Sequence, residues 1–525
     1  MATIRETEDG KFLKDFVDPS QPEFVPLNET LSRLKALPGD PHLLIHLHGG
    51  LVNRHRGYKI AKRLAEHSKV GIGNDNYEQM SIIWGSGAFE TVITNFKELA
   101  EDKLFDRLLK KILEWASGRV LDFGDGARGA GRSLVPPQVE AAINQAKANI
   151  DTPQAEEPFP IDRRASEMIS DPDGLDDATA SADLTRMLES DNALVQLSAA
   201  LDAELREKEF ADKRGTVDGG IAREARKTES RLSPAFFTAY GAELQASPLQ
   251  TRSQLGQIAL KTIIKQAIKA GFAVVRRYRE KRDHDFYPTV FEEIARHFFV
   301  GTIASRVWKF MKDDTADHFK PGGAGTDLLE KLNTLNAGLE DGRRLRLTIV
   351  GHSAGCIFAG EILKALNAPG SDLDLPPVDL IFLAPAVKFK LFGEALNVAG
   401  NKVRRFHMFT MADGYEKQDK LLGAFYPRSL LYMISGALEF SEADVPLLGM
   451  DRFHRVSASG RVYSAEEQQA IDIVHQFLER SDIHSVWSKT GSSAAAGHKS
   501  LAVKHGQFDD DEKTLESIVH LACTP

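Results

Sequence analysis

One serine in the chain has neighbours whose types and spacing could make it a nucleophile. The segment from residue 348 to 360 reads TIVGHSAGCIFAG and places Ser353 in a G-x-S-x-G pattern. A run of β-branched residues precedes it and a sequence with helical spacing follows it, which predicts a strand, a tight turn and a helix. In such a turn, with His352 before the serine, Gly351 and Gly355 prevent collisions with the neighbouring strand and helix. The turn would expose Ser353 Oγ at the C-terminal edge of a sheet; the alternative is a plain turn in which the serine caps the helix.

A nucleophilic serine needs a general base, an acid that orients the base, and donors for the oxyanion. The sequence HLHGGL indicates the donors, because it follows an apolar run and carries Gly49 and Gly50, whose amides could reach the site. The amide of Ala354, next to the serine, would be the second donor. His46 and His48 are expected to brace this loop. A metal pair is the alternative for H-x-H, but no nearby carboxylate or third histidine completes it.

The orienting acid is expected after a later strand. In RRFHMFTMADGYEKQD the apolar run ends at Met411, and Asp413 follows in a turn at the C-terminal edge of the predicted strand. A carboxylate in that position could hold a histidine ring, so Asp413 is the predicted acid. Glu416 and Asp419 are its close competitors, although solvation or helix capping is the more usual role for such residues.

The base should come last in the chain order serine, acid, histidine. Six histidines follow Asp413: His454, His475, His484, His498, His505 and His520. His505 is the predicted base, because LAVKHGQFDDDEKTLESIV places it on a loop beside Gly506, just before a helix with an acidic first turn. His498 is the second choice. His475 and His520 lie in predicted helices, where packing or surface roles are expected.

The elements that must position these residues form an interrupted α/β pattern. Residues 41–87 alternate short apolar runs with a helical segment, and the pattern resumes over 286–525. Between them, residues 88–285 are charged and mostly helical, with Gly-, Pro- and Asp-rich breaks that suggest flexible linkers. Residues 1–40 form an N-terminal extension. The expected fold is therefore one doubly wound, mostly parallel sheet with a large, mainly helical insertion.

The ordered set of Ser353, the HGG loop, Asp413 and His505 resembles the α/β-hydrolase superfamily of serine hydrolases. The resemblance covers about half to two thirds of the chain, over residues 41–87 and 286–525. It implies an α/β-hydrolase fold with the triad at the C-terminal edge of the sheet. The insertion departs from a minimal member; members often carry lids, usually after a later strand, so a lid is only one interpretation of residues 88–285.

Composition limits the classes of function. The chain has 525 residues, a net charge of −9 and two cysteines. The charge balance argues against a nucleic-acid partner, and so few cysteines fit a reducing compartment, so a cytoplasmic location is expected. The N-terminus lacks the apolar run of a secretory signal, and no segment is long and apolar enough to span a bilayer. The stretch from Ile258 carries a lysine stripe beside an apolar stripe, which favours a helix packed on the domain over one lying on a membrane.

The predicted function is hydrolysis of a carboxylic ester or related acyl bond through an acyl-enzyme on Ser353. A small-molecule or lipid-like acyl ester is the expected substrate, and no cofactor or metal is expected. The alternative is a catalytically inactive binding or scaffold protein with the same fold. A dinucleotide site at Gly124, Gly126 and Gly129 is disfavoured, because Gly131 and two prolines follow where a helix should begin. Cys356 is expected to pack inside its helix.

Overall fold

The computed structural model describes the chain except residues 1, 22–23, 51, 73–76, 86–102, 122–183, 189–254, 299–304, 424, 440–441, 456–460 and 525. The disfavoured dinucleotide motif, from Gly124 to Gly131, lies outside the described residues. Most of the predicted insertion also lies outside them, apart from residues 103–121, 184–188 and 255–285.

A single eight-stranded sheet organises the described part of the chain, in the order β2-β1-β4-β3-β5-β6-β7-β8. All neighbouring strands run parallel except β1 and β2, which are antiparallel, so the prediction of a mostly parallel sheet is confirmed. The strands are β1 Ala2–Glu8, β2 Lys11–Phe16, β3 His42–Leu47, β4 Tyr77–Ile83, β5 Arg346–His352, β6 Val378–Leu383, β7 Val403–Met411 and β8 Ile483–Ser488.

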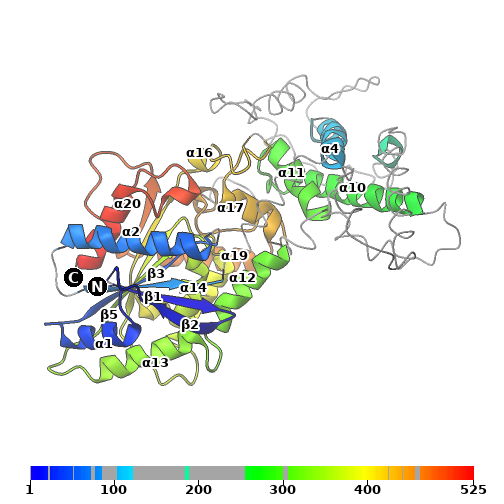
Figure 1. Cartoon of the computed structure of the whole chain (residues 1–525). Helices are drawn as coiled ribbons and strands as arrows, with labels where there is room; N and C mark the ends of the chain where they lie inside the picture. Colours follow the sequence, from blue (N-terminus) through cyan, green and yellow to red (C-terminus); the bar gives the residue numbers. More distant parts are fainter. Residues whose placement is uncertain are drawn as a thin grey trace, which may run out of the picture.

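Helices cover both faces of this sheet (Figure 1). One face packs against α2 and α20, which also contact each other, and the other packs against α1, α13, α14 and α15. The helices are α1 Leu27–Ala36, α2 Arg54–Ile72, α4 Lys103–Leu121, α10 Leu255–Arg279, α11 Phe286–Ala295, α12 Ser305–Asp317, α13 Ala324–Ala337, α14 Gly355–Ala365, α15 Phe389–Ala399, α16 Asp413–Glu416, α17 Leu430–Met433, α18 Asp451–His454, α19 Ala465–Leu478 and α20 Glu512–Cys523. Short turns of other helix types are η3 Gly400–Lys402, η4 Ile434–Leu438 and η6 His505–Gln507.

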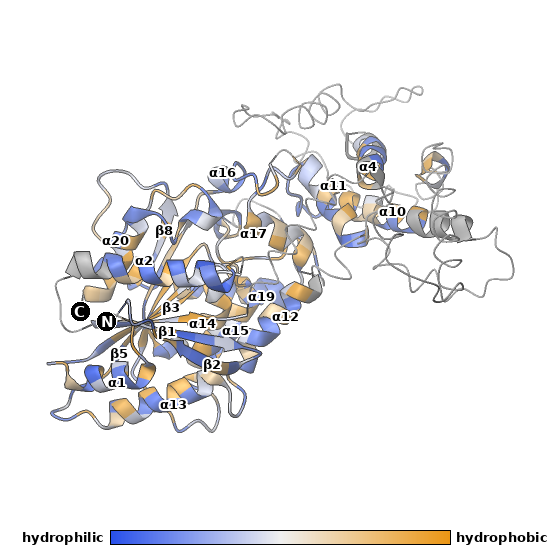
Figure 2. Ribbon diagram, in the orientation of Figure 1, coloured by the Kyte–Doolittle hydropathy of each residue, from blue (hydrophilic) through white to orange (hydrophobic). Residues whose placement is uncertain are grey.

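Burial explains why the central strands read as continuous apolar runs. Every residue of β3 and β6 is buried, as expected for strands covered on both faces. In Figure 2 the central strand β3 is orange, whereas the edge strand β2 is largely blue. Four of the six residues of β2 are exposed, which is where the sheet meets solvent.

The order of the strands reverses between β3 and β5. From β3 the chain continues outward to β4, whereas from β5 it builds the opposite half through β6, β7 and β8. In open parallel sheets, the crevice at such a reversal, beyond the carboxyl ends of the strands, is the usual place for a ligand. The loop after β3 and the turn after β5 meet there.

The N-terminal extension forms part of the sheet. β1 pairs with β4 in parallel and with β2 in antiparallel, and six of its seven residues are buried. No strand was predicted in this region, where Arg5, Glu6 and Glu8 interrupt any apolar run. The structure satisfies these charges with ion pairs, such as the one between Arg5 and Asp15 at 3.2 Å.

The amphipathic stretch from Ile258 lies in α10, which packs against α4 and α11 at one side of the sheet (Figure 1). Ile264 is buried, and Phe272 meets Trp115 of α4 edge to face at 5.5 Å. Lys265 and Lys269 are exposed. The described part of this helix therefore packs its apolar stripe on the protein, as predicted. No described helix is long and apolar enough to cross a membrane.

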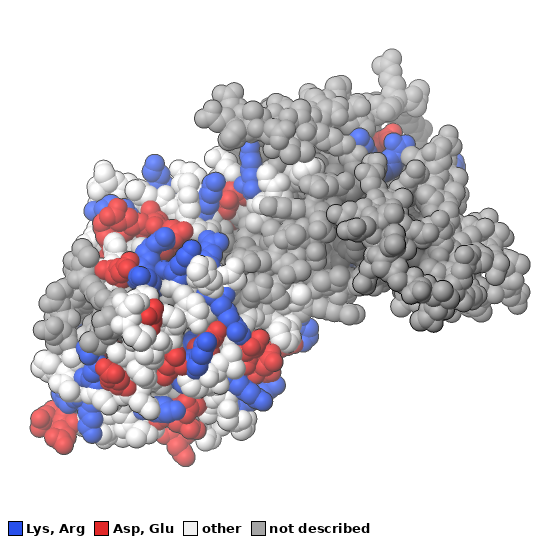
Figure 3. Space-filling model, in the orientation of Figure 1, with Lys and Arg blue, Asp and Glu red and all other residues white. Residues whose placement is uncertain are grey.

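The described residues on the face drawn in Figure 3 carry charges of both signs. On the face drawn in Figure 3, Lys and Arg side chains are interspersed with Asp and Glu over the sheet and its helices. This mixture agrees with the net charge of the chain, −9, and it differs from the basic face that a nucleic-acid-binding surface would present.

Candidate active site

Ser353 stands in a strained turn between β5 and α14. Its φ is +53°, in the left-handed region that side-chain-bearing residues rarely adopt. Three main-chain hydrogen bonds hold the turn: Ser353 N–H donates to Leu383 at 2.8 Å, and its carbonyl accepts from Cys356 and Ala386, each at 3.1 Å. The strain is thus maintained by neighbouring segments, as is common where a side chain must be presented for chemistry.

Glycines make this turn sterically possible. A Cβ on Gly355 would lie 2.3 Å from the carbonyl oxygen of Leu47, and one on Gly351 would lie 2.9 Å from the main chain of Gly355 and Cys356. Neither contact is tolerable, because real Cβ atoms do not approach backbone atoms so closely. The spacing of the G-x-S-x-G pattern therefore has the steric origin that the sequence analysis expected.

The structure brings His505 to Ser353. His505 stands in η6, and its Nε2 lies 2.9 Å from Ser353 Oγ, within hydrogen-bond distance. The main chain of His505 is fixed on both sides, since its N–H donates to Asp419 at 2.8 Å and its carbonyl accepts from His352 Nε2 at 3.1 Å. Burial lowers the pKa of His505 to about 3, and nearby His352 acts in the same direction. The imidazole is therefore neutral at neutral pH, the state in which it could accept a proton.

The glycine loop after β3 lies directly against the serine. A Cβ on Gly49 would be 3.3 Å from Ser353 Cβ, and one on Gly50 would be 3.1 Å from Ala354 Cβ. Ala354 precedes the first residue of α14, so its amide belongs to the positive end of that helix. The three amides that sequence analysis selected as oxyanion donors thus belong to two backbone segments that converge beside Ser353.

His48 braces this loop, as the sequence analysis expected of it. Its Nδ1–H donates to Gly49 O at 2.9 Å, its Nε2 accepts from Trp84 N–H at 3.2 Å, and its ring stacks on the Trp84 indole. Burial lowers the pKa of His48 to about 4 and of His46 to about 3. Among the described residues, neither histidine belongs to a group of three potential metal ligands.

Two aspartates that the sequence analysis did not select adjoin the base. Asp419 lies in the segment after β7 and accepts from the His505 main chain. Asp509 is buried, and its Oδ2 lies 3.3 Å from Nδ1 of His352, whose ring stacks near that of His505. Burial raises the pKa of Asp509, but His352, His46 and Arg56 together outweigh burial and lower this pKa to about 2. Asp419 was named as a competitor; Asp509 was read as part of an acidic helix start.

Asp413 is not brought to His505. It follows the end of β7, as expected, but its Oδ1 accepts from the Tyr432 hydroxyl at 2.5 Å and its Oδ2 pairs with Lys417 at 3.0 Å. The reason is local: the chain enters the short helix α16 at Asp413, which turns this carboxylate towards α17. The next candidate, Glu416, is buried against Ser429. Asp419, six residues beyond Asp413, is the first acid of this segment to reach the base.

The remaining histidines have other surroundings. His454 Nε2 donates to Leu448 O, and His475 Nε2 donates to Phe453 O. His520 is exposed on α20. His498, the second choice for the base, lies beside His407 and His484 instead of Ser353. Cys356 is fully buried in α14 with its Sγ directed to Gly351 O at 3.0 Å, and burial raises its pKa well above the usual range, which agrees with a packing role.

A cavity of about 320 Å³ opens onto Ser353 and His505. Its described lining combines the glycine loop, both aspartates and three basic residues, namely Arg56, Lys420 and Lys504. A larger cavity of about 680 Å³ lies between α13 and α14, but it holds no paired nucleophile and base. The smaller cavity is therefore the candidate active site.

Comparison with known proteins adds no assignment. No protein-family model, curated protein or solved structure matches this chain. The case for a function therefore rests on the residues and geometry of the site itself.

Proposed function

We propose that this protein is a serine hydrolase of the α/β-hydrolase type, which cleaves a carboxylic ester or related acyl bond. The observation that carries the proposal is the 2.9 Å contact between Ser353 Oγ and His505 Nε2, at a strained turn that faces a cavity. A nucleophilic hydroxyl within hydrogen-bond reach of a neutral imidazole is the arrangement that acyl transfer requires. The position of both residues at the reversal of strand order supports the same reading.

In the proposed reaction, His505 accepts the proton of Ser353 as Oγ attacks the substrate carbonyl carbon. The amides of Gly49, Gly50 and Ala354 stabilise the oxyanion. When the tetrahedral intermediate collapses, the protonated His505 gives its proton to the departing alkoxide, and an acyl-serine remains. Water, deprotonated by His505, then attacks the acyl group, and release of the acid restores Ser353.

We propose Asp419 as the acid that orients His505, in place of Asp413. Asp419 already holds the main chain of His505 and lies in the same cavity. His505 Nδ1 is buried and has no hydrogen-bond partner among the described residues, so this atom is left for an orienting carboxylate. Asp509 would support the same ring, because it lies beside His352 and its charge also acts to raise the pKa of His505.

The test is hydrolysis of p-nitrophenyl esters of increasing acyl length by the wild type and by Ser353→Ala. We expect turnover by the wild type, with short acyl groups preferred because the cavity is near the lower end of the size range of ligand sites. Turnover should fall nearly to background in the variant. An active Ser353→Ala protein would contradict the proposal.

A serine-reactive fluorophosphonate separates the enzyme from a binding protein of the same fold. We expect labelling of the wild type and none of Ser353→Ala. Labelling without ester turnover would support Ser353 as the nucleophile and indicate that the substrate is a thioester or an amide instead of an ester. Neither labelling nor turnover would favour the inactive binding or scaffold protein.

A further inference from the structure

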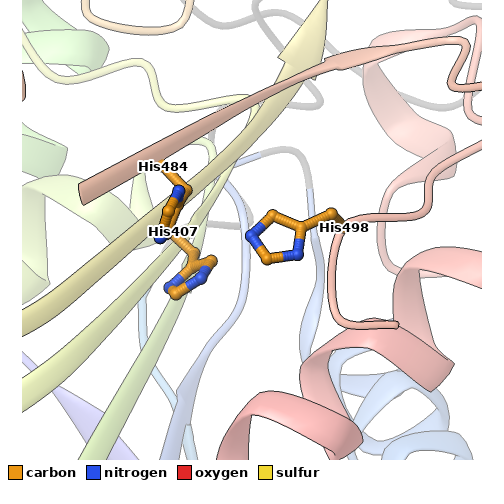
Figure 4. Close-up of side chains that lie close together, drawn as sticks. All are labelled: His407, His484 and His498. Atoms are coloured by element: carbon orange, nitrogen blue, oxygen red, sulfur yellow. The ribbon is translucent and has the colours of Figure 1, made fainter. Parts of the chain in front are cut away.

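Three histidines from distant parts of the sequence converge on the opposite half of the sheet from the glycine loop. His407 lies in β7, His484 in β8 and His498 in the segment that connects β8 to η6. Each offers a ring nitrogen within 4.8 Å of those of the other two. Figure 4 shows the two strand residues side by side, with His498 directed towards them from its loop.

Strand register explains how two of these rings meet. His407 and His484 are direct partners in the parallel pair β7–β8, so their side chains leave the sheet on the same face. Their ring centroids lie 4.9 Å apart, and His498 closes the group at 5.3 Å from His407 and 4.9 Å from His484. The group therefore depends on the pairing of β7 with β8 and on the path of one loop.

The hydrogen bonding of the cluster leaves nitrogen lone pairs for a ligand. His407 is 5% exposed, yet its Nε2 has no hydrogen-bond partner among the described residues. Buried polar atoms without a partner are rare and call for one. His498 Nδ1 donates to the carbonyl of Ala496 at 3.2 Å, which leaves its Nε2 as an acceptor. A backbone carbonyl that fixes the tautomer in this way is the usual second partner of a metal-binding histidine.

The surroundings of the cluster favour the neutral form of its histidines, so the three rings are not expected to share a proton. Burial lowers the pKa of His407 to about 3, and the two other histidines act in the same direction. Burial and His498 also lower the pKa of His484, whereas Asp482 opposes them. Neutral imidazoles are the form that binds transition metals.

We infer that His407, His484 and His498 form a binding site for a divalent transition-metal ion of the zinc class. Three imidazoles with one open position are a recognised zinc arrangement, and Zn–N bonds of about 2.0–2.1 Å would bring the nitrogens closer together than in the ion-free group. The exposed His484 and half-buried His498 have the freedom for this adjustment. The ion would tie the loop after β8 to both strands.

This site is separate from the candidate active site. His407 is level with Ile381 of β6, and Ile381 is level with Val350 of β5, so Ser353 lies two strands away and farther along the sheet. The ion would not touch the proposed nucleophile. The metal site is linked to the candidate active site only by sequence, because the loop that carries His498 leads to His505. The inference does not require the proposed hydrolase activity.

The test is direct metal binding by the full chain after treatment with a chelator. Co²⁺ is titrated while the visible absorption of tetrahedral cobalt is followed, and Zn²⁺ is then added to displace it. Isothermal titration calorimetry with Zn²⁺ gives the stoichiometry. The variants are His484→Ala and His498→Ala, which change side chains that are not fully buried. His520→Ala, an exposed histidine on α20, is the matched control.

We expect one equivalent of metal in the wild type and in the control variant. Loss of one imidazole should weaken binding at least about tenfold, since even partners outside the coordination sphere cost that much. Zn²⁺ should also raise the melting temperature of the wild type and of the control, but not of the two cluster variants. No binding to the wild type, or unchanged affinity in either cluster variant, would overturn the inference, provided that circular dichroism shows both variants folded. A variant that fails this check is replaced by the corresponding His→Gln variant, to which the same criteria apply.

Discussion

At the residue scale, the histidine that contacts Ser353 is fixed by its main chain more than by its ring. Asp419 and His352 hold the N–H and carbonyl of His505, while Ser353 is the hydrogen-bond partner of Nε2. Fixing the peptide units on both sides limits where the ring can go, so the proposed base stays within reach of the proposed nucleophile. An acid that holds the backbone of the base is well placed to orient the ring as well.

Replacement of Asp419 by Asn should therefore reduce kcat/KM for esters by about 10²–10⁴-fold, the range over which an orienting carboxylate commonly acts. Asp413→Asn is the matched control and should stay within about threefold, because Asp413 bonds to Tyr432 and Lys417. Steady-state kinetics of both variants decides whether Asp419 or Asp413 is the orienting acid. A large loss in Asp413→Asn with none in Asp419→Asn would restore the sequence-based choice.

The limits of sequence reasoning are visible at this scale. Ser353, His505 and the glycine loop could be selected from sequence, because glycine spacing and chain order reflect local sterics. The acid could not, because Asp413, Glu416 and Asp419 all follow β7 within a few residues. Which one faces the base depends on the helical turn α16 and on the Tyr432 hydroxyl, a contact that spans 19 residues.

At the element scale, the turn after β5 and the loop after β3 are packed to their steric limit. The Gly355 Cα lies so close to the Leu47 and His48 carbonyls that a methyl group would overlap both, at 2.3 and 2.8 Å. This contact sets the distance between α14 and β3, and with it the distance between the glycine loop and Ser353.

Gly355→Ala should therefore destabilise the fold by about 3 kcal/mol, the upper end of the usual cost of overpacking, because a rigid backbone has to move. Gly414→Ala is a suitable comparison, since its Cβ would meet nothing within 4 Å and it lies in the short helix α16. Its stability should change little or rise slightly. Urea unfolding of both variants measures the difference, and equal midpoints would show that the α14–β3 contact can relax.

The apolar runs before the glycine loop, Ser353 and Asp413 predicted the strands that the structure shows as β3, β5 and β7, but no pattern predicted β1, β2 or β8. Strand β8 reads IHSVWS, and only three of its six residues are buried. Edge and next-to-edge strands carry polar and charged residues, because solvent or ion pairs satisfy them. Their place in the sheet follows from pairing with distant strands, which a local pattern does not record.

At the scale of the whole molecule, the described residues include several buried or half-buried histidines that are kept neutral. Burial lowers the pKa to about 3 for His42, His46, His407 and His505, and to about 4 for His48 and His454. In the unfolded chain these histidines regain an ordinary pKa near 6.5. Below that pH the unfolded state binds more protons than the folded state.

Stability should therefore fall as the pH decreases from about 6.5 towards 4, and the fall should begin above the range in which most carboxylates titrate. Urea unfolding at a series of pH values measures this, with the midpoint expected to drop steadily over that interval. Above pH 7 these histidines are neutral in both states, so they contribute no slope. A flat midpoint between pH 6.5 and 4.5 would show that they are not protonated on unfolding, contrary to their burial.

The pairing of β1 with β4 has a consequence for self-association. β1 and β2 together cover the backbone edge of β4, a strand in which six of the seven residues are buried. A chain trimmed to begin at Leu27 would expose that edge as a row of unsatisfied amides and carbonyls. Such an edge can recruit the same edge of another molecule. β1 and β2 would thus protect β4 against pairing with another molecule, and shortened versions of the protein should keep both strands.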